Sequence, residues 1–211
     1  MTFLIQRRSV LYCSMTNWEQ CYLDGQTPWD KGTGSPPLAE WVCTHRPRGR
    51  ALVPGCGAGH DVAMLVEAGV DAAGLDIAPS AVERARAAYP ALTSRFVLGD
   101  LFATPQDWRA GFDLVAEHTC LCALPPSLRV EYEKAVHELL RPGGLLAGVW
   151  FIHPEMDPGE SGPPFGISVE ELGGLFPAER WEVVEDRVPE SGYEGRVGRE
   201  RLRVLRKTGA S

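Results

Sequence analysis

Three glycines, Gly55, Gly57 and Gly59, give this 211-residue chain its clearest potential for ligand chemistry. They stand between the apolar run 51–53 and a run typical of a helix, 62–66. Glycine has no Cβ, so the backbone can turn sharply there and pass close to a ligand. The unpaired N–H groups at the following helix start suit a polar or anionic ligand group. The pattern predicts a nucleotide-type binding turn after a strand, with a turn that serves packing alone as the alternative.

Two aspartates follow later apolar runs. Asp76 ends the second run, about twenty residues after the glycines, where a carboxylate can accept hydrogen bonds from both hydroxyls of a ribose. Its alternative role is to cap the next helix. Asp100 precedes the apolar pair Leu101 and Phe102. This grouping predicts an acid that binds an adenine amino group between apolar side chains, and a turn aspartate is the alternative.

Glu117 and His118 follow the fourth apolar run and are the candidate catalytic residues. In an open α/β sheet, active-site residues lie at this end of the strands. A histidine there can accept a proton or orient a substrate. The alternative is a histidine that only forms a hydrogen bond with a loop.

Three further residues are candidates for a pocket wall. Trp18 and Trp29 lie in a segment rich in turn-forming residues, where a large aromatic side chain covers a core edge, lines a pocket or faces a cation. Arg196 precedes the last strand. By its position alone it is expected to be a solvated surface arginine, and a contact with an anionic substrate is implied only by the family resemblance given below.

The composition, 44% hydrophobic and 23% charged, indicates a globular domain. The formal net charge is −7, and the lack of a basic run disfavours a nucleic-acid partner. No run approaches the roughly 20 apolar residues of a membrane span. The six cysteines contain no C-x-x-C pair, so we expect no metal and reduced thiols in a cytoplasmic protein. Residues 1–15 are interpreted as an N-terminal extension rather than a signal peptide, which leaves 16–211 as one domain.

Runs typical of strands and helices alternate along the chain. The strands with their exits are predicted at 51–53, 70–76, 94–102, 112–122, 145–152, 181–188 and 200–206. A helix is expected between successive strands except the last two, which predicts a doubly wound, Rossmann-like α/β sheet that is mostly parallel. The last connection is too short for a crossover helix, so the C-terminal strand is expected to be antiparallel. Residues 153–164 are expected to form a loop or lid.

Five segments resemble, in order and spacing, the motifs of class I S-adenosylmethionine-dependent methyltransferases. They are Gly55–Gly59, Asp76, Gly99–Leu101, Phe112–Val115 and Leu140–Gly144. A narrower resemblance points to the thiopurine methyltransferase family, and most of all to its thiol and halide branch. It is carried by Thr27–Asp30, Leu52–Gly57, His60–Asp61, Gly74–Ile77, Cys122–Ala123 and Gly162–Phe165. The resemblance covers nearly all of residues 16–207.

The resemblance implies S-adenosylmethionine as the cofactor and S-adenosylhomocysteine as the product. It places the glycine turn at the methionyl part, Asp76 at the ribose, and Asp100 with its apolar neighbours at the adenine. The expected cofactor-binding residues are Trp18, Trp29, Pro54, Gly55, Cys56, Gly57, Gly59, Asp76, Ile77, Asp100, Leu101, Phe102 and Glu117. The expected substrate-binding residues are His118, Phe165 and Arg196.

Two positions depart from the thiol and halide branch. Glu117–His118 stands where Asp–Tyr is typical, and Phe165 stands where a tyrosine is typical. In the branch, those tyrosines face the small anionic nucleophile. Their absence disfavours a halide and favours a larger or more apolar thiol.

We therefore expect an enzyme that methylates a small-molecule thiol and that is a monomer or weak homodimer. One alternative is methylation of a halide, or of an O or N nucleophile in a small metabolite. Others are a nicotinamide-binding oxidoreductase and a non-catalytic cofactor-binding module. The missing third glycine of the dinucleotide fingerprint and the extra acid Asp100 argue against the oxidoreductase.

Overall fold

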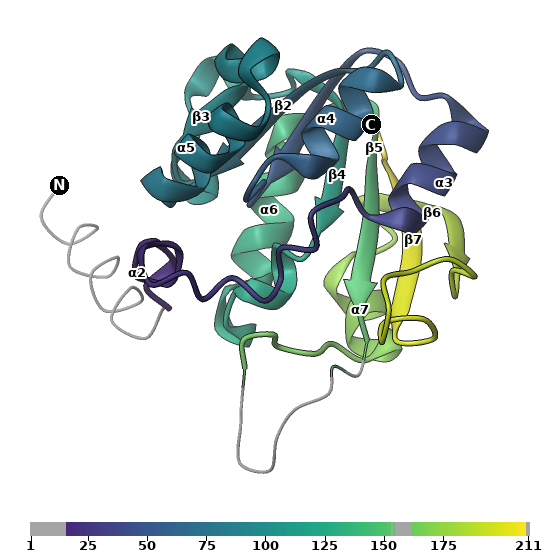
Figure 1. The fold of residues 1–211 in the computed structure, drawn as a ribbon. Coiled ribbons are helices and arrows are strands. Elements are labelled where there is room, and N and C mark those ends of the chain that lie inside the picture. Colours follow the sequence, from purple (N-terminus) through teal and green to yellow (C-terminus); the bar gives the residue numbers. More distant parts are fainter. Residues whose placement is uncertain (1–15, 153, 155–161, 210–211) are drawn as a thin grey trace, which may run out of the picture.

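The computed structural model describes residues 16–152, 154 and 162–209, which form a seven-stranded sheet with helices on both faces (Figure 1). The strands lie in the order β3-β2-β1-β4-β5-β7-β6. Their bounds are β1 Arg50–Pro54, β2 Asp71–Asp76, β3 Phe96–Leu98, β4 Phe112–His118, β5 Leu140–Phe151, β6 Trp181–Arg187 and β7 Glu200–Lys207. The helices are α2 Trp18–Leu23, α3 Pro36–His45, α4 His60–Glu67, α5 Pro79–Ala88, α6 Arg129–Leu139 and α7 Val169–Leu175.

The sheet is parallel from β3 to β5. β7 lies between β5 and β6 and runs antiparallel to both. The connection between β6 and β7, residues 188–199, is too short for a crossover helix, so the chain must reverse. The expected mostly parallel α/β sheet with an antiparallel C-terminal strand is confirmed. The reversal also leaves residues 188–199 as a loop at the edge where the parallel strands end.

Each face of the sheet has its own hydrophobic core, and this explains why the central strands carry apolar residues on both sides. Val115 of β4 belongs to the core under α6, together with Tyr132 and Val136. Its neighbour Leu114 belongs to the opposite core, together with Leu38 of α3 and Val62 of α4. The strands therefore rest between two packed layers, and their ends are held in place relative to one another.

The helix expected between the third and fourth strands is absent from the described chain. The connection instead forms two short 3₁₀ turns, Leu101–Ala103 and Gln106–Trp108. The side chain of Asp100 accepts a hydrogen bond from the Phe102 N–H at 2.8 Å and caps the first turn. Pro105 precedes the second, where its fixed φ and missing N–H oppose a longer helix. The prediction of a helix here was wrong.

Other element boundaries also differ from the sequence interpretation. The third strand begins at Phe96 rather than near residue 94, because residues 90–95 form a 3₁₀ turn that starts at Pro90. The helix expected from Pro126 begins at Arg129, after another 3₁₀ turn. β5 begins at Leu140 and includes the segment interpreted as a break, with a shift in its pairing to β4. The capping box at Ser168 is confirmed.

Two expectations concern residues outside the described ranges. The N-terminal extension, residues 1–15, lies entirely outside them. The expected lid, residues 153–164, is described only at residue 154 and at its last three residues. Within the described ranges, no helix has the length and apolar character needed to cross a bilayer. The same ranges contain no cluster of His, Cys, Asp and Glu side chains suited to a metal ion.

Gly59 shows why the glycine turn permits close packing. It is the N-cap of α4 and has a φ of 85°. A Cβ added there would lie 2.6 Å from the Phe96 ring and 3.0 Å from the Ala85 Cβ. The missing side chain therefore lets the start of α4 approach β3 and α5.

Replacement of Gly59 by alanine should lower the free energy of unfolding by roughly 2–4 kcal/mol, from left-handed strain plus overpacking. Gly143→Ala is the matched control, because Gly143 has a φ of 77° but open space around its Cβ position. The control should lose only the strain, about 1–2 kcal/mol. Urea unfolding measures both, and equal losses would contradict the packing argument.

Candidate active site

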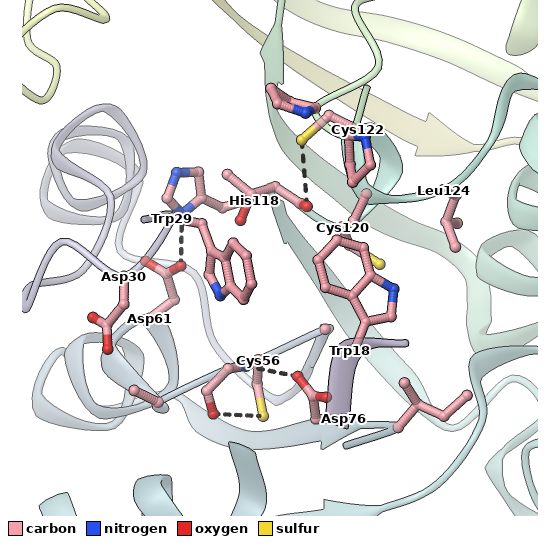
Figure 2. Close-up of a pocket in the computed structure, with 18 of the residues that line it drawn as sticks. Trp18, Trp29, Asp30, Cys56, Asp61, Asp76, His118, Cys120, Cys122 and Leu124 are labelled. Atoms are coloured by element: carbon pink, nitrogen blue, oxygen red, sulfur yellow. Dashed lines mark hydrogen bonds and ion pairs between the residues drawn. The ribbon is translucent and has the colours of Figure 1, made fainter. Parts of the chain in front are cut away.

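A cavity of about 340 Å³ lies where β1, β2 and β4 and the exit of β3 meet, at the carboxyl ends of the parallel strands. This volume lies in the range of small-molecule sites. Figure 2 shows side chains from several elements converging on it. Of the residues expected from sequence, the cavity is lined by Trp18, Trp29, Gly55, Cys56, Gly57, Asp76, Ile77, Asp100, Leu101, Phe102, His118 and Arg196.

The glycine turn after β1 presents bare backbone to the cavity. Gly55 and Gly57 have φ values of 59° and 52°, which a side chain would strain. A Cβ on Gly57 would also lie 3.1 Å from the Tyr22 hydroxyl. The buried residues Pro54 and Gly59 do not line the cavity. Pro54 ends a buried strand, and Gly59 faces Phe96 and Ala85, so the expected role of these two in ligand binding stays a prediction.

Asp76 lines the cavity and also supports the start of the next helix. Its Oδ2 accepts a hydrogen bond from the Gly57 N–H at 2.9 Å, and its Oδ1 accepts one from the Ala78 N–H at 2.9 Å. Ala78 is the N-cap of α5, so the carboxylate also supports the helix start. Burial raises the pKa of Asp76 despite these bonds. A carboxylate offers about four acceptor positions, so Asp76 retains capacity for ligand hydroxyls.

An apolar slot continues from Asp76 along the same edge. Ile77 lines it from the exit of β2, and Leu101 and Phe102 line it from the exit of β3. Asp100 stands at the mouth of this slot, where its carboxylate holds the 3₁₀ turn that carries both apolar residues. The slot therefore presents apolar walls and an adjacent carboxylate, as the sequence predicted.

Aromatic residues near the N-terminus form the opposite wall. The rings of Trp18 and Trp29 meet edge to face with centroids 5.3 Å apart. The indole N–H of Trp29 donates to the Tyr22 hydroxyl at 3.2 Å. These side chains pack with Ala78 and Ala81 in a small separate cluster. Their position on the cavity supports the pocket interpretation of both tryptophans.

The strap, defined here as residues 24–34, joins α2 to α3 (Figure 1). Side-chain contacts tie it to α4 and α5. Asp30 of the strap lies 3.0 Å from the His60 Nε2 at the start of α4. The other ring nitrogen of His60 pairs with the Tyr89 hydroxyl at 2.7 Å. Arg84 of α5 donates to the Thr27 hydroxyl of the strap at 3.4 Å. These contacts hold the strap across the cavity.

His118 lies at the end of the cavity away from the apolar slot and is 7% exposed. Its Nδ1 is 3.0 Å from the Asp61 Oδ2 (Figure 2). The other oxygen of Asp61 accepts the Ser35 N–H at 2.7 Å. Burial acts to raise the pKa of Asp61, but the His118 contact and the Ser35 hydrogen bond outweigh it and lower that pKa.

Tyr193 and Arg196, from the β6–β7 loop (residues 188–199), complete this end of the cavity. The Tyr193 ring lies against His118 with centroids 5.7 Å apart. Arg196 lies over the Phe151 ring at 4.9 Å and contacts the Glu200 carboxylate at 3.3 Å. Arg196 is therefore a pocket residue rather than a solvated arginine.

Glu117 does not line the cavity, so its expected catalytic and cofactor-binding roles stay predictions that the cavity lining does not support. Its side chain is 1% exposed and accepts the N–H groups of Cys120 and Leu121 at 2.9 and 3.1 Å. Its second oxygen accepts the Tyr132 hydroxyl. Alternation along β4 explains this, because neighbouring side chains point to opposite faces. Glu117 supports the turn beneath the cavity.

Phe165 also lies outside the cavity. Its N–H donates to the Cys122 carbonyl at 2.7 Å, and its ring borders a separate void of about 10 Å³. Pro163 and Pro164 line the cavity instead. The neighbouring prolines present the surface of this segment to the pocket, so the substrate-binding role of Phe165 stays a prediction that the cavity lining does not support.

Three cysteines, Cys56, Cys120 and Cys122, line the cavity as free thiols. Burial raises the pKa of Cys56 and Cys120 well above the ordinary value and that of Cys122 to about 12. The nearby carboxylates act in the same direction. At neutral pH the three side chains are thiols, which are poor nucleophiles.

Sequence reasoning did not single out Tyr22, Asp61 or Tyr193 as site residues by their chemistry. Asp61 had a detectable signal, since an acid in the first turn after a glycine loop faces the same cavity as the loop. Tyr193 had none, because its place depends on the reversal between β6 and β7. Tyr22 is at the cavity because α2 packs on α5.

The sequence profile of the thiopurine S-methyltransferase family matches residues 13–204. The chain belongs to this family. It is 35% identical over 192 residues to thiocyanate methyltransferase 1 of Brassica oleracea, covering 88% of this chain and 82% of that protein. It is 34% identical over 202 residues to probable thiol methyltransferase 2 of Arabidopsis thaliana, covering 92% and 86% of the two chains.

The fold is also shared with solved methyltransferases. The structure of Burkholderia thailandensis 1,6-didemethyltoxoflavin-N1-methyltransferase has a TM-score of 0.70 and 22% identity to this chain, covering 97% of this chain and 90% of that one. The protein is therefore an S-adenosylmethionine-dependent methyltransferase with a Rossmann-like sheet. Its cavity has the features that the cofactor requires. The bare backbone of Gly55–Gly57 is followed by the Asp76 carboxylate, which can accept further hydrogen bonds, and then by the apolar slot.

Replacement of Asp76 by alanine should weaken S-adenosylmethionine binding by roughly 1–3 kcal/mol, because charge-assisted hydrogen bonds to the ligand are lost. Glu117→Gln is the control, since that carboxylate is equally buried but outside the cavity. Isothermal titration calorimetry should show affinity close to wild type for the control. Unchanged affinity in Asp76→Ala would overturn the assignment.

Replacement of Trp29 by alanine should lower cofactor affinity about tenfold, roughly 1.4 kcal/mol, while the melting temperature changes little. Trp108→Ala is the comparison, because that ring also packs edge to face, on Phe112 at 5.5 Å, but lies away from the cavity. It should lower the melting temperature without a change in affinity. If Trp29→Ala lowers the melting temperature as much as Trp108→Ala does, in addition to lowering the cofactor affinity, Trp29 is a core-edge residue.

Proposed function

We propose that this protein transfers a methyl group from S-adenosylmethionine to the sulfur of a small-molecule thiol. The observation that carries the proposal is the end of the cavity beyond the glycine turn. There His118 lies beside apolar walls from Phe151, Pro163 and Pro164. A soft, apolar sulfur nucleophile suits these walls. The names of the plant relatives, a thiocyanate and a probable thiol methyltransferase, support the same acceptor element.

The cavity suggests one orientation for the cofactor. We propose that the adenine lies in the slot of Ile77, Leu101 and Phe102 beside Asp100, and that Asp76 binds the ribose. The methionyl part then lies along Gly55–Gly57, between the glycine turn and the two tryptophans. This order follows the sequence of wall types along the cavity and directs the sulfonium toward His118.

When bound, the cofactor supplies a methyl group on a sulfonium, which is a good leaving group. The residues of this chain then have mainly to align the acceptor and exclude water. Trp18 and Trp29 line the cavity with their rings in contact, and Tyr193 joins the β6–β7 loop to the strap through a hydrogen bond to the Thr33 carbonyl at 2.7 Å. We propose that these segments keep the reacting atoms dry.

Arg196 bears on the choice between a thiol and an inorganic anion. Its charge is shared with Glu200, which is 3% exposed and contacts it at 3.3 Å. A halide would have to compete with that carboxylate for the guanidinium. We propose that Arg196 orients a polar part of the thiol substrate and that iodide is a poor acceptor.

We further propose a cytoplasmic monomer or weak homodimer that binds no nucleic acid. The net charge of −7 opposes the phosphate backbone. The described cysteines are free, as is usual in a reducing compartment.

A methyl-transfer assay tests the acceptor. Purified protein and S-adenosylmethionine are incubated separately with hydrosulfide, an aryl thiol, a thiopurine, thiocyanate and iodide, and release of S-adenosylhomocysteine is measured. We expect turnover with at least one thiol and none with iodide. Turnover with iodide alone would make this a halide methyltransferase. Cofactor binding without turnover of any thiol would overturn the proposed acceptor while leaving the family assignment intact.

A further inference from the structure

One buried ring nitrogen at the cavity lacks a hydrogen-bond partner among the described residues. This atom, the Nε2 of His118, is hidden from bulk water. Buried polar atoms are nearly always paired, so an unpaired one calls for an explanation. His118 lines the cavity, and a ligand there is the available source of a partner.

The contact between Asp61 and the His118 Nδ1 decides which ring nitrogen carries the hydrogen. The Asp61 carboxylate accepts the Ser35 N–H on one oxygen and lies 3.0 Å from the His118 Nδ1 on the other. A charged carboxylate can only accept, so the hydrogen of a neutral imidazole lies on Nδ1. Nε2 then carries a lone pair directed away from Asp61. Asp61 is held in place by the backbone of residue 35, so it fixes both the tautomer and the ring orientation.

From this geometry we propose that Asp61 and His118 form a proton-accepting dyad, and that the acceptor site takes thiols in their neutral, protonated form. The proposal rests on the thiol-methyltransferase function proposed above and specifies its substrate class. His118 contacts the substrate and is the catalytic base. Asp61 acts through His118 and is a positioning residue.

The proton and electrons balance without another reactant. The substrate S–H bond breaks, its proton moves to the His118 Nε2, and its electron pair stays on sulfur. Asp61 compensates the charge of the resulting imidazolium. The thiolate then forms the new S–CH₃ bond as the methyl–sulfonium bond breaks, with that electron pair left on S-adenosylhomocysteine. His118 returns its proton to water when the products leave.

The charges around His118 favour a neutral acceptor over an anion. Asp61, Glu117 and Glu200 all lie near enough for their charges to interact with the imidazole. The nearby guanidinium of Arg196 is shared with Glu200. Tyr193 covers the ring, and burial raises the pKa of its phenol, which keeps it uncharged. Asp61 lines this end of the cavity, while Glu117 and Glu200 lie behind its wall. An ionised thiol is therefore expected to bind more weakly than a neutral one, although it can still react, and it brings no proton for Nε2.

Comparing the rates with two thiols of different acidity shows whether His118 is a catalytic base or only a structural residue. 2-Mercaptoethanol is mainly protonated at pH 7, like a cysteine side chain with a pKa of about 8.5. 4-Nitrothiophenol is ionised at that pH and needs no base. In His118→Gln and Asp61→Asn, kcat/KM should fall at least about 100-fold for 2-mercaptoethanol and less than about threefold for 4-nitrothiophenol. At higher pH the variants should recover activity with 2-mercaptoethanol, because the thiol then ionises in solution.

Asp30→Asn is the matched control. It alters a second His–Asp pair at the cavity, with the same 3.0 Å separation, but the remaining nitrogen of His60 is already paired with Tyr89. It should lower the rates with the two thiols in equal proportion, through the strap. Equal losses with both thiols in the His118 and Asp61 variants, or no loss with 2-mercaptoethanol, would overturn the dyad.

A measurement on the unaltered protein gives a readout that does not depend on activity or on a variant's folding. Two-bond ¹H–¹⁵N spectra of the histidine rings should place the hydrogen of neutral His118 on Nδ1. A hydrogen on Nε2 would overturn the proposal. If the wild-type protein binds S-adenosylmethionine but methylates neither these two thiols nor any other thiol of the panel above, the proposed function fails and the dyad's role fails with it. Failure of the variants to discriminate, with wild-type turnover intact, removes the dyad alone.

Discussion

The Asp76 carboxylate is the contact on which the site depends most. One oxygen holds the Gly57 N–H after β1, and the other holds the Ala78 N–H after β2. Two neighbouring strand ends are thus joined by one side chain, and the glycine turn adopts its shape without any side chain of its own. Because Asp76 is buried, water does not compete for these two hydrogen bonds. The remaining lone pairs of its carboxylate are accessible only from the cavity.

The cover of the site is built differently from its floor. The floor comes from strand ends that the two hydrophobic cores hold rigidly. The cover comes from two segments far apart in the chain, the strap and the β6–β7 loop, which meet at Tyr193 and Thr33. Glu40 of α3 also accepts hydrogen bonds from Ser191 and Arg187. Elements with few buried contacts open at lower free energy than the core, so entry to the cavity is expected through the cover.

Sequence patterns predicted the parts of the protein that follow local rules. The apolar runs, the glycine turn and the acids at strand ends located the sheet and the cofactor side of the cavity, because carboxyl ends of parallel strands share one edge. The error at residues 101–108 arose because Asp100 and Pro105 favour 3₁₀ turns over a helix. The sequence named Glu117 and His118 together because it does not state which face of β4 each residue occupies, and of the two only His118 lines the cavity. Tyr193 could not be found, since its contact with His118 joins loops that no local pattern connects.

S-adenosylmethionine is an alkylating agent, and three thiols of the protein stand in the cavity wall. The sulfur atoms of Cys56, Cys120 and Cys122 line the cavity that we propose as the cofactor site, where a reactive methyl group could alkylate them. Their burial keeps them protonated, so the protein's own sulfur atoms remain unreactive. The low polarity that excludes water from the proposed acceptor site thus also protects the enzyme from methylation by its own cofactor. The cysteine thiols of the wall keep their protons, whereas a substrate thiol beside His118 can lose its proton and react.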